Sequence, residues 1–164
     1  MNAKWSRTCN VGSVDEKYDV WPSTSGVYII RTGRPIQRIG GADKTGVLYI
    51  GKTRNLRIRI WKFFQSDHTA SGFLWTHTEI ARLVLNQDIR TTSEVKKHLG
   101  KLTVRYAEPI SVKHLALAER ALLFSYLACF GEAPPFNLSL PSRWDMKPES
   151  RELHWAEAGI QSRA

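Results

Sequence analysis

One carboxylate stands in the apolar face of a predicted helix. The stretch HLALAERALLFSYLACF, residues 114–130, has apolar side chains at helical spacing on both sides of Glu119. On a wheel of about 100° per residue, Leu115 and Leu123 lie about 40° from Glu119, so its carboxylate should point into the core. An unpaired buried carboxylate costs several kcal/mol or takes up a proton. We therefore expect Glu119 to meet an Arg, a Lys or a metal ion, and half of a structural ion pair is the alternative to a functional site.

Positive charge is concentrated in one segment of the chain. The formal net charge is +9, and residues 31–62 contain nine basic residues and one acidic residue, Asp43. A local excess of positive charge is typical of surfaces that bind a polyanion. The alternative is a solvated basic surface, but the concentration in one fifth of the chain favours nucleic acid. The candidate nucleic-acid-binding residues, as general phosphate contacts, are Arg34, Arg38, Arg54, Arg57 and Lys62.

Length and composition indicate an ordinary globular protein. The chain has 164 residues, of which 42% are hydrophobic and 24% charged, and no apolar run approaches the length of a membrane-spanning helix. The N-terminus lacks the apolar core of a secretory signal, and Cys9 and Cys129 have no zinc-ligand spacing, so we expect a cytoplasmic protein without a disulfide. We expect an N-terminal arm over 1–21, one domain over 22–140 and a C-terminal extension over 141–164.

Strand and helix patterns alternate along the chain. Runs of β-branched and aromatic residues predict strands, and apolar residues at i, i+4 and i+7 predict helices. The predicted strands are 26–31, 47–50 (ended by Gly51) and 102–107, and the predicted helices are 55–65, 73–86, 92–98 and 113–130 (closed by Gly131). This order predicts a small α/β (α+β) sandwich, in which helices flank a mostly antiparallel, three-stranded sheet.

Two short motifs resemble those of a known family. Gly26-Val27-Tyr28 and Tyr49-Ile50-Gly51 are similar to the half-motifs of the GIY-YIG nuclease superfamily, and Lys52 to Arg59 is similar to the start of its signature helix. The resemblance covers residues 22–140 and implies a GIY-YIG-like fold that hydrolyses phosphodiester bonds with a divalent metal. A compact chain of this kind resembles a stand-alone, restriction-endonuclease-like member. We therefore expect DNA as the partner and a homodimer that cuts both strands.

The resemblance assigns roles to three further residues. Arg59 matches the family's catalytic arginine and would grip the scissile phosphate through paired donors. Glu119 matches its metal-binding glutamate and would hold Mg²⁺ (or Mn²⁺), a hard cation that keeps several waters and takes another ligand from phosphate. Asn137 matches its late asparagine and would position helix and loop by hydrogen bonds, unless it is only a turn residue. A simple ion pair between Arg59 and Glu119 is the alternative to both of their catalytic roles.

The resemblance also suggests which groups move protons. Tyr28 is expected to take a proton from the attacking water, its pKa lowered by the metal or by Arg59, while Tyr49 orients the reactants. Lys52 would lower the pKa of a tyrosine or contact phosphate. The alternative for Tyr28 is core packing, which is the usual role of an aromatic residue in a strand.

Two features depart from the family pattern. The half-motifs are separated by residues 29–48, a longer gap than is usual, and the extra residues form a basic loop that could read DNA. Members often have His or Tyr four residues after the catalytic arginine, where this chain has Phe63; His68 is the candidate replacement in a catalytic role. If nothing compensates, the chain would be a catalytically weak or inactive nucleic-acid-binding module. A nuclease toxin or mobile-element protein would use the same chemistry.

Overall fold

The structure is a computed structural model that describes residues 4–10, 21–64 and 102–137. The predicted features outside the described residues are helices 73–86 and 92–98, the extension 141–164 and His68. Within the part that is described, no helix is long and apolar enough to cross a membrane.

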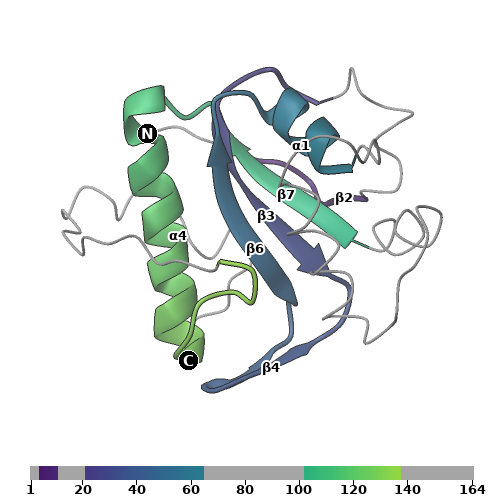
Figure 1. The fold of residues 1–164 in the computed structure, drawn as a ribbon, viewed down its shortest axis with the longest axis vertical. Coiled ribbons are helices and arrows are strands. Elements are labelled where there is room, and N and C mark those ends of the chain that lie inside the picture. Colours follow the sequence, from purple (N-terminus) through teal and green to yellow (C-terminus); the bar gives the residue numbers. More distant parts are fainter. Residues whose placement is uncertain (1–3, 11–20, 65–101, 138–164) are drawn as a thin grey trace.

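An antiparallel sheet forms the centre of the molecule (Figure 1). Its long strands are β3 (Gly26–Thr32), β6 (Val47–Thr53) and β7 (Leu102–Glu108), with β3 between the other two. Two short strands, β1 (Lys4–Trp5) and β2 (Cys9–Asn10), also pair with β7. The predicted mixture of helices and a mostly antiparallel sheet is confirmed. The prediction of a three-stranded sheet is corrected to five strands, because the two-residue strands within residues 4–10 are too short to show an alternating pattern.

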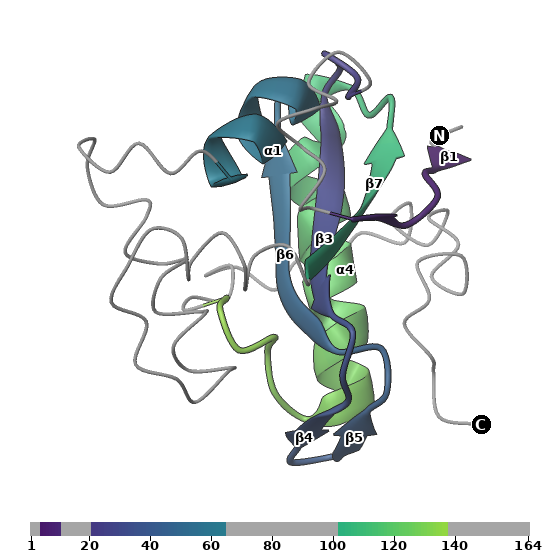
Figure 2. The same cartoon turned by 90° about the vertical axis from the view of Figure 1, so that its right-hand side faces the viewer.

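The sheet has a helix on each face (Figure 2). One is α1 (Leu56–Phe64), and the other is α4 (Leu115–Phe130), which follows the short 3₁₀ helix η3 (Val112–His114). Because side chains alternate along a strand, Tyr28 of β3 lies in the apolar cluster on the α1 side and Val27 in the cluster on the α4 side. Both helices lie where the sequence predicts them, and they pack on opposite faces of the sheet.

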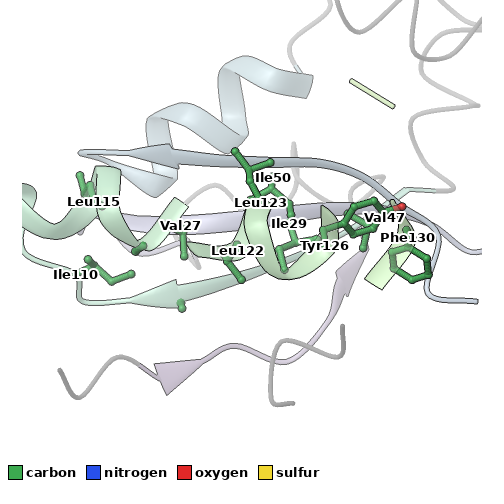
Figure 3. Close-up of a cluster of buried hydrophobic side chains, with 12 residues drawn as sticks. Val27, Ile29, Val47, Ile50, Ile110, Leu115, Leu122, Leu123, Tyr126 and Phe130 are labelled. Atoms are coloured by element: carbon green, nitrogen blue, oxygen red, sulfur yellow. The ribbon is translucent and has the colours of Figure 1, made fainter. Parts of the chain in front are cut away.

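The face under α4 is a closed apolar core. Figure 3 shows side chains of β3 and β6 meeting those of α4. Ile29, Ile50 and Leu122 are all 0% exposed, and burying one such side chain stabilises a fold by about 1.5–3 kcal/mol. Gly131 ends α4 with a φ of 75°, and its N–H donates to the carbonyl of Leu127 (2.8 Å). The predicted closure by Gly131 is therefore confirmed, in the left-handed conformation that favours glycine.

The basic segment between β3 and β6 forms a hairpin. Its strands β4 (Ile36–Arg38) and β5 (Gly41–Asp43) pair antiparallel, where the sequence analysis predicts a basic loop. Asp43 is 0% exposed, and its Oδ2 accepts hydrogen bonds from the N–H of Val47 (2.8 Å) and the hydroxyl of Tyr126 (2.9 Å). The one acidic residue of the basic segment is thus a buried anchor between the hairpin, β6 and α4.

Candidate active site

Two tyrosine rings meet over a glycine in the sheet. Tyr28 on β3 is paired with Gly51 on β6, and the ring centroids of Tyr28 and Tyr49 are 5.9 Å apart. A Cβ on Gly51 would lie 2.6 Å from Cε1 of Tyr49 and 2.8 Å from the hydroxyl oxygen of Tyr28. Glycine is therefore the residue that leaves room for both rings. The prediction that Gly51 ends the strand is wrong, because β6 continues through it to Thr53.

Arg59 reaches the tyrosine pair from α1. Its Nε donates a hydrogen bond to the hydroxyl oxygen of Tyr28 (3.0 Å). The helix starts directly after β6, and Asn55 caps it by accepting a hydrogen bond at Oδ1 from the N–H of Ile58 (3.0 Å). This short connection places Arg59 one turn into α1, on the side that faces the sheet.

Burial holds Tyr28 in its neutral form. Its side chain is 1% exposed, and burial raises the pKa of its phenol well above the ordinary value; Tyr49 raises this pKa further, and Arg59 lowers it by less. Arg59 lowers the pKa of Tyr28 as expected, but the loss of solvation outweighs this effect, so the net shift is upward. Tyr49 is half-buried and is the more accessible of the two phenols.

Glu119 pairs with a lysine at the margin of the core. Lys52 Nζ and Glu119 Oε2 form an ion pair, with side chains 41% and 16% exposed. The expected burial of Glu119 is only partial, because it faces the last residues of the edge strand β6, where Lys52 and solvent reach it. The expectation of a cationic partner is met by Lys52, and this pair forms in place of the alternative pair between Arg59 and Glu119.

The two groups of candidate residues lie on opposite faces of one edge strand. β6 is the outer strand of the sheet, with β3 on its inner side. Tyr49 packs on the α1 side, whereas Lys52, which is paired with Val27, reaches Glu119 on the α4 side. Neighbouring residues on a strand are only about 3.3 Å apart along its axis. The exposed end of β6 is therefore where one extended ligand could contact both groups.

Asn137 fastens the segment after α4 to the edge of β6. Its Nδ2 donates to the carbonyl of Ile50 (2.7 Å), and its Oδ1 accepts from the N–H of Ile50 (3.0 Å). The N–H of Phe136 donates to the carbonyl of Leu48 (3.1 Å) in the same way. Asn137 thus occupies the outward backbone groups of the residue between Tyr49 and Gly51, and it acts on the site as a positioning residue.

The residues around Glu119 can be compared with what a divalent cation requires. Among residues 4–10, 21–64 and 102–137, no three His, Cys, Asp or Glu side chains gather into a metal-binding group. Mg²⁺ is commonly held by one or two carboxylates, with waters and substrate phosphates as its other ligands. Glu119 fits that arrangement, and Lys52 beside it fits the phosphate. The residues suit a hard cation that binds together with a substrate, rather than a preformed metal cage.

The predicted phosphate contacts on the hairpin and before α1 differ in accessibility. Arg34 and Arg54 are exposed. Arg38 is 10% exposed, and its Nη2 forms an ion pair with Glu132 Oε2 (3.2 Å). Arg34 and Arg54 therefore remain available to a polyanion, whereas Arg38 mainly holds the hairpin to the segment after α4.

The predicted contacts on α1 are only partly described. Arg57 donates through Nε to the carbonyl of Trp21 (2.7 Å), which ties α1 to the start of the domain. The side chains of Lys62 and Phe63 lie outside the described residues, and so does His68. The structure therefore leaves the consequence of Phe63 as a prediction.

The sequence analysis missed the steric role of two glycines. Gly51 makes room for the tyrosine rings, and a Cβ on Gly26 would clash with the carbonyl of Ala107 and lie 2.8 Å from Cδ1 of Leu56. Gly26 thereby lets α1 pack closely on β3. The signal was present in the sequence, because a glycine inside a strand often marks a close approach of other groups.

Comparison with known proteins adds no assignment. Neither a scan against protein-family models nor searches of curated proteins and solved structures found a match for this chain. The function must therefore be argued from the site itself.

Proposed function

We propose that this chain is a metal-dependent endonuclease of the GIY-YIG type that hydrolyses phosphodiester bonds in DNA. The observation that carries the proposal is the meeting of Tyr28, Tyr49 and Arg59 around Gly51. These residues come from two strands and a helix, and a glycine is needed for the rings to meet. A half-buried phenol and a guanidinium beside a buried phenol suit a phosphate and a nucleophilic water.

Arg59 is the phosphate-binding group in this proposal. A guanidinium has five N–H donors in a fixed plane, and the bond from Nε to Tyr28 uses one of them and fixes the orientation of that plane. A phosphate bound by Arg59 would lie beside the tyrosine pair. Arg59 would then stabilise the negative charge that develops on phosphorus-bound oxygens during hydrolysis.

The two phenols have different roles. Tyr28 keeps its proton because burial raises its pKa, so it orients Arg59 and donates a hydrogen bond. Tyr49 is more accessible, and in its phenolate form it would accept a proton from the attacking water. This exchanges the roles that the sequence suggested for Tyr28 and Tyr49.

Glu119 and Lys52 act from the other face of β6. Glu119 would hold Mg²⁺ or Mn²⁺, which when bound supplies Lewis-acid stabilisation of charge on the phosphate and the leaving oxygen. Lys52 holds Glu119 in the absence of substrate and would turn to the phosphate backbone when DNA lies across the end of β6. Arg34 and Arg54, which are exposed, would contact phosphates away from the cut.

A cleavage assay tests the proposal. Supercoiled plasmid would be incubated with the wild type, Arg59→Ala, Tyr49→Phe and Glu119→Gln, with Mg²⁺, Mn²⁺ or EDTA. We expect metal-dependent cutting by the wild type and a loss of roughly 10²- to 10³-fold or more in Arg59→Ala, since one charge-stabilising donor group in an active site is typically worth that much. Arg7→Ala is the control, because Arg7 is exposed between β1 and β2, which pair with β7 at the edge of the sheet opposite β6.

A second candidate function is a nucleic-acid-binding module without cleavage. It is favoured by the contact that Lys52 makes with the presumed metal ligand Glu119 and by the raised pKa of Tyr28. Binding of duplex DNA without cutting by any variant in either metal would establish this module and refute the nuclease. Cutting that is equal in the wild type and in Arg59→Ala would assign the activity to another part of the chain or to a contaminant.

A further inference from the structure

A pocket opens beside the candidate active site. Its volume is about 440 Å³, and its walls include Arg34, Pro35, Ile36 and Gln37 on one side and Pro135 and Phe136 on the other. The volume lies in the range of small-molecule sites in proteins, about 300–1,000 Å³. The pocket therefore lies between the basic hairpin and the segment that follows α4.

The pocket and the tyrosine pair share one face of the sheet and one edge strand. Phe136 and Ile36 pack with the cluster on the α1 side that includes Tyr28 and Tyr49. The N–H of Phe136 donates to the carbonyl of Leu48, the residue before Tyr49 (3.1 Å). Figure 2 shows the yellow-green segment after α4 beside β6, with β4 and β5 at the end of the sheet. A DNA strand that runs along β6 from Tyr49 toward β4, at the end of the sheet opposite α1, would therefore reach the pocket.

The lining has the chemistry that a nucleobase requires. Pro35, Ile36, Pro135 and Phe136 supply apolar walls, and the exposed side chains of Arg34 and Gln37 stand at the rim. The lining residues include no acidic side chain, which suits a ligand that carries phosphate. Arg pairs with the O6 and N7 acceptors of guanine, and Gln pairs with N6 and N7 of adenine. A flat base with a hydrogen-bonding edge matches this combination better than an aliphatic ligand does.

The two walls are fastened to each other. The guanidinium of Arg38 pairs with Glu132 and donates to the carbonyl of Ala133, two residues before Pro135. The N–H of Gly40 donates to the carbonyl of Phe130 at the end of α4 (2.8 Å), and a Cβ on Gly40 would lie 2.8 Å from that backbone. The pocket is therefore held at a fixed width, as selection of one size of ligand requires.

We propose that this pocket binds one nucleobase of the substrate strand next to the cut, with its face against Pro135 and Phe136 and its edge read by Arg34 and Gln37. The proposal rests on the proposed function, because the base must belong to a strand held at Tyr49 and Arg59. Such a base has to leave the duplex stack, at a cost of about a few kcal/mol, or come from a single-stranded region. The pocket would then contribute to which base is tolerated at the cut.

Binding of single nucleotides tests the pocket without any cleavage. The ¹⁵N-labelled chain would be titrated with dAMP, dGMP, dCMP and dTMP, and amide shifts would be followed. We expect saturable amide shifts in Arg34, residues 36–38 and Phe136, strongest for one or both purines. The affinity should fall roughly tenfold or more in Arg34→Ala and in Gln37→Ala. Lys44→Ala is the matched control, because it removes one exposed positive charge from the same insertion but from outside the pocket lining. Its affinity should stay within about twofold.

The outcomes separate this proposal from the nuclease proposal. Shifts that persist in Arg59→Ala while cleavage is lost would place base binding and phosphate binding in different groups, as proposed. No saturable shifts with any nucleotide would overturn the inference. Equal losses of affinity in Arg34→Ala and Lys44→Ala would also overturn it, because they would indicate general electrostatic attraction rather than binding in the pocket. Shifts of the same amides when the chain is diluted without nucleotide would indicate that a second copy of the chain binds in the pocket. That result would also overturn the inference.

Discussion

The two faces of the sheet use the same three strands but are filled differently. Under α4 the side chains form a closely packed apolar core that is mostly aliphatic, as for Leu122 at 0% exposure. Under α1, the corresponding positions carry Tyr28 and Tyr49, with Gly51 between them and Arg59 above. A fold of this size needs one closed core for stability, and the comparison indicates that α4 supplies it. The α1 face can therefore hold polar groups that a core alone would not need.

The largest expected effect is a loss of stability from the α4 face. Leu122→Ala should lower the free energy of unfolding by about 2–5 kcal/mol, through lost burial and the cavity left behind. Cleavage per folded molecule should change little, because Leu122 lies on the opposite side of the sheet from Tyr49. Urea unfolding and the plasmid assay below the unfolding transition measure the two quantities.

Leu127→Ala is the matched control for that substitution. Leu127 lies on the same helix but is only half-buried, so the same atoms are removed at a smaller cost. Equal losses in the free energy of unfolding of the two variants would show that Leu122 is not buried as the structure describes. A selective loss of cleavage in Leu122→Ala would show that the two faces are not independent.

A smaller effect on stability is expected from Gly51, together with a large effect on cleavage. In Gly51→Ala the added methyl group would meet both tyrosine rings within 2.8 Å, and such overpacking typically costs about 1–3 kcal/mol. The rings must move apart, so the contact between Tyr28 and Arg59 should be disturbed. Urea unfolding measures the first effect, and the plasmid assay measures the second.

Gly33→Ala is the control for the glycine substitution. A Cβ on Gly33 would meet nothing within 4 Å, so stability should change by less than about 0.5 kcal/mol, as for most exposed sites. If Gly51→Ala behaved like Gly33→Ala in both assays, the tyrosine rings would not pack over Gly51 in solution, and the observation that carries the proposed function would be lost.

Most of the regular elements were predictable from local patterns. The strands around Val27 and Ile50 and the helix that contains Leu122 are long enough for hydrophobic periodicity to show. The short strands β1 and β2 and the hairpin strands β4 and β5 were not predictable, since two or three residues carry no period. β1 and β2 form by pairing with the open edge of β7, and the β4–β5 hairpin is held by the buried side chain of Asp43. Neither contact can be seen in a short stretch of sequence.

The candidate site was predictable in its members and less so in its arrangement. Motif spacing selected Tyr28, Tyr49 and Arg59, and the structure brings them together. The pairing of Lys52 with Glu119 joins residues 67 positions apart. The helical wheel of residues 114–130 could predict only that Glu119 needs a cationic partner. The balance at Tyr28, where burial raises the pKa more than Arg59 lowers it, was not predictable, because burial depends on how α1 packs on the sheet.

The smallest expected effect is on the pH dependence of stability, and it compares the buried tyrosines Tyr28 and Tyr126 of the two faces. Burial raises the pKa of both Tyr28 and Tyr126, and the nearby anion Asp43 raises that of Tyr126 further. Each neutral phenol is favoured by the fold, so its contribution to stability is complete below the unfolded-state pKa of about 10. It declines as the pH rises above that value, by up to about 1.4 kcal/mol per pH unit for one proton. Tyr28→Phe should therefore flatten the decline in stability between pH 10 and 11.

The same measurement compares the partners of the two phenols. Tyr126→Phe should flatten the alkaline decline too, but it should also cost about 1.5–3 kcal/mol at pH 7, because buried Asp43 loses a donor to its carboxylate. Tyr28→Phe removes one hydrogen bond between a hydroxyl and the half-buried Arg59 and leaves no buried carboxylate without a donor, so its cost at pH 7 should be nearer 1 kcal/mol. Urea unfolding of the wild type and both variants at pH 7, 9, 10 and 11 gives all of these values. An alkaline slope unchanged in Tyr28→Phe would mean that this phenol is solvated in solution, which would return it to the role of proton acceptor and reverse the assignment between Tyr28 and Tyr49.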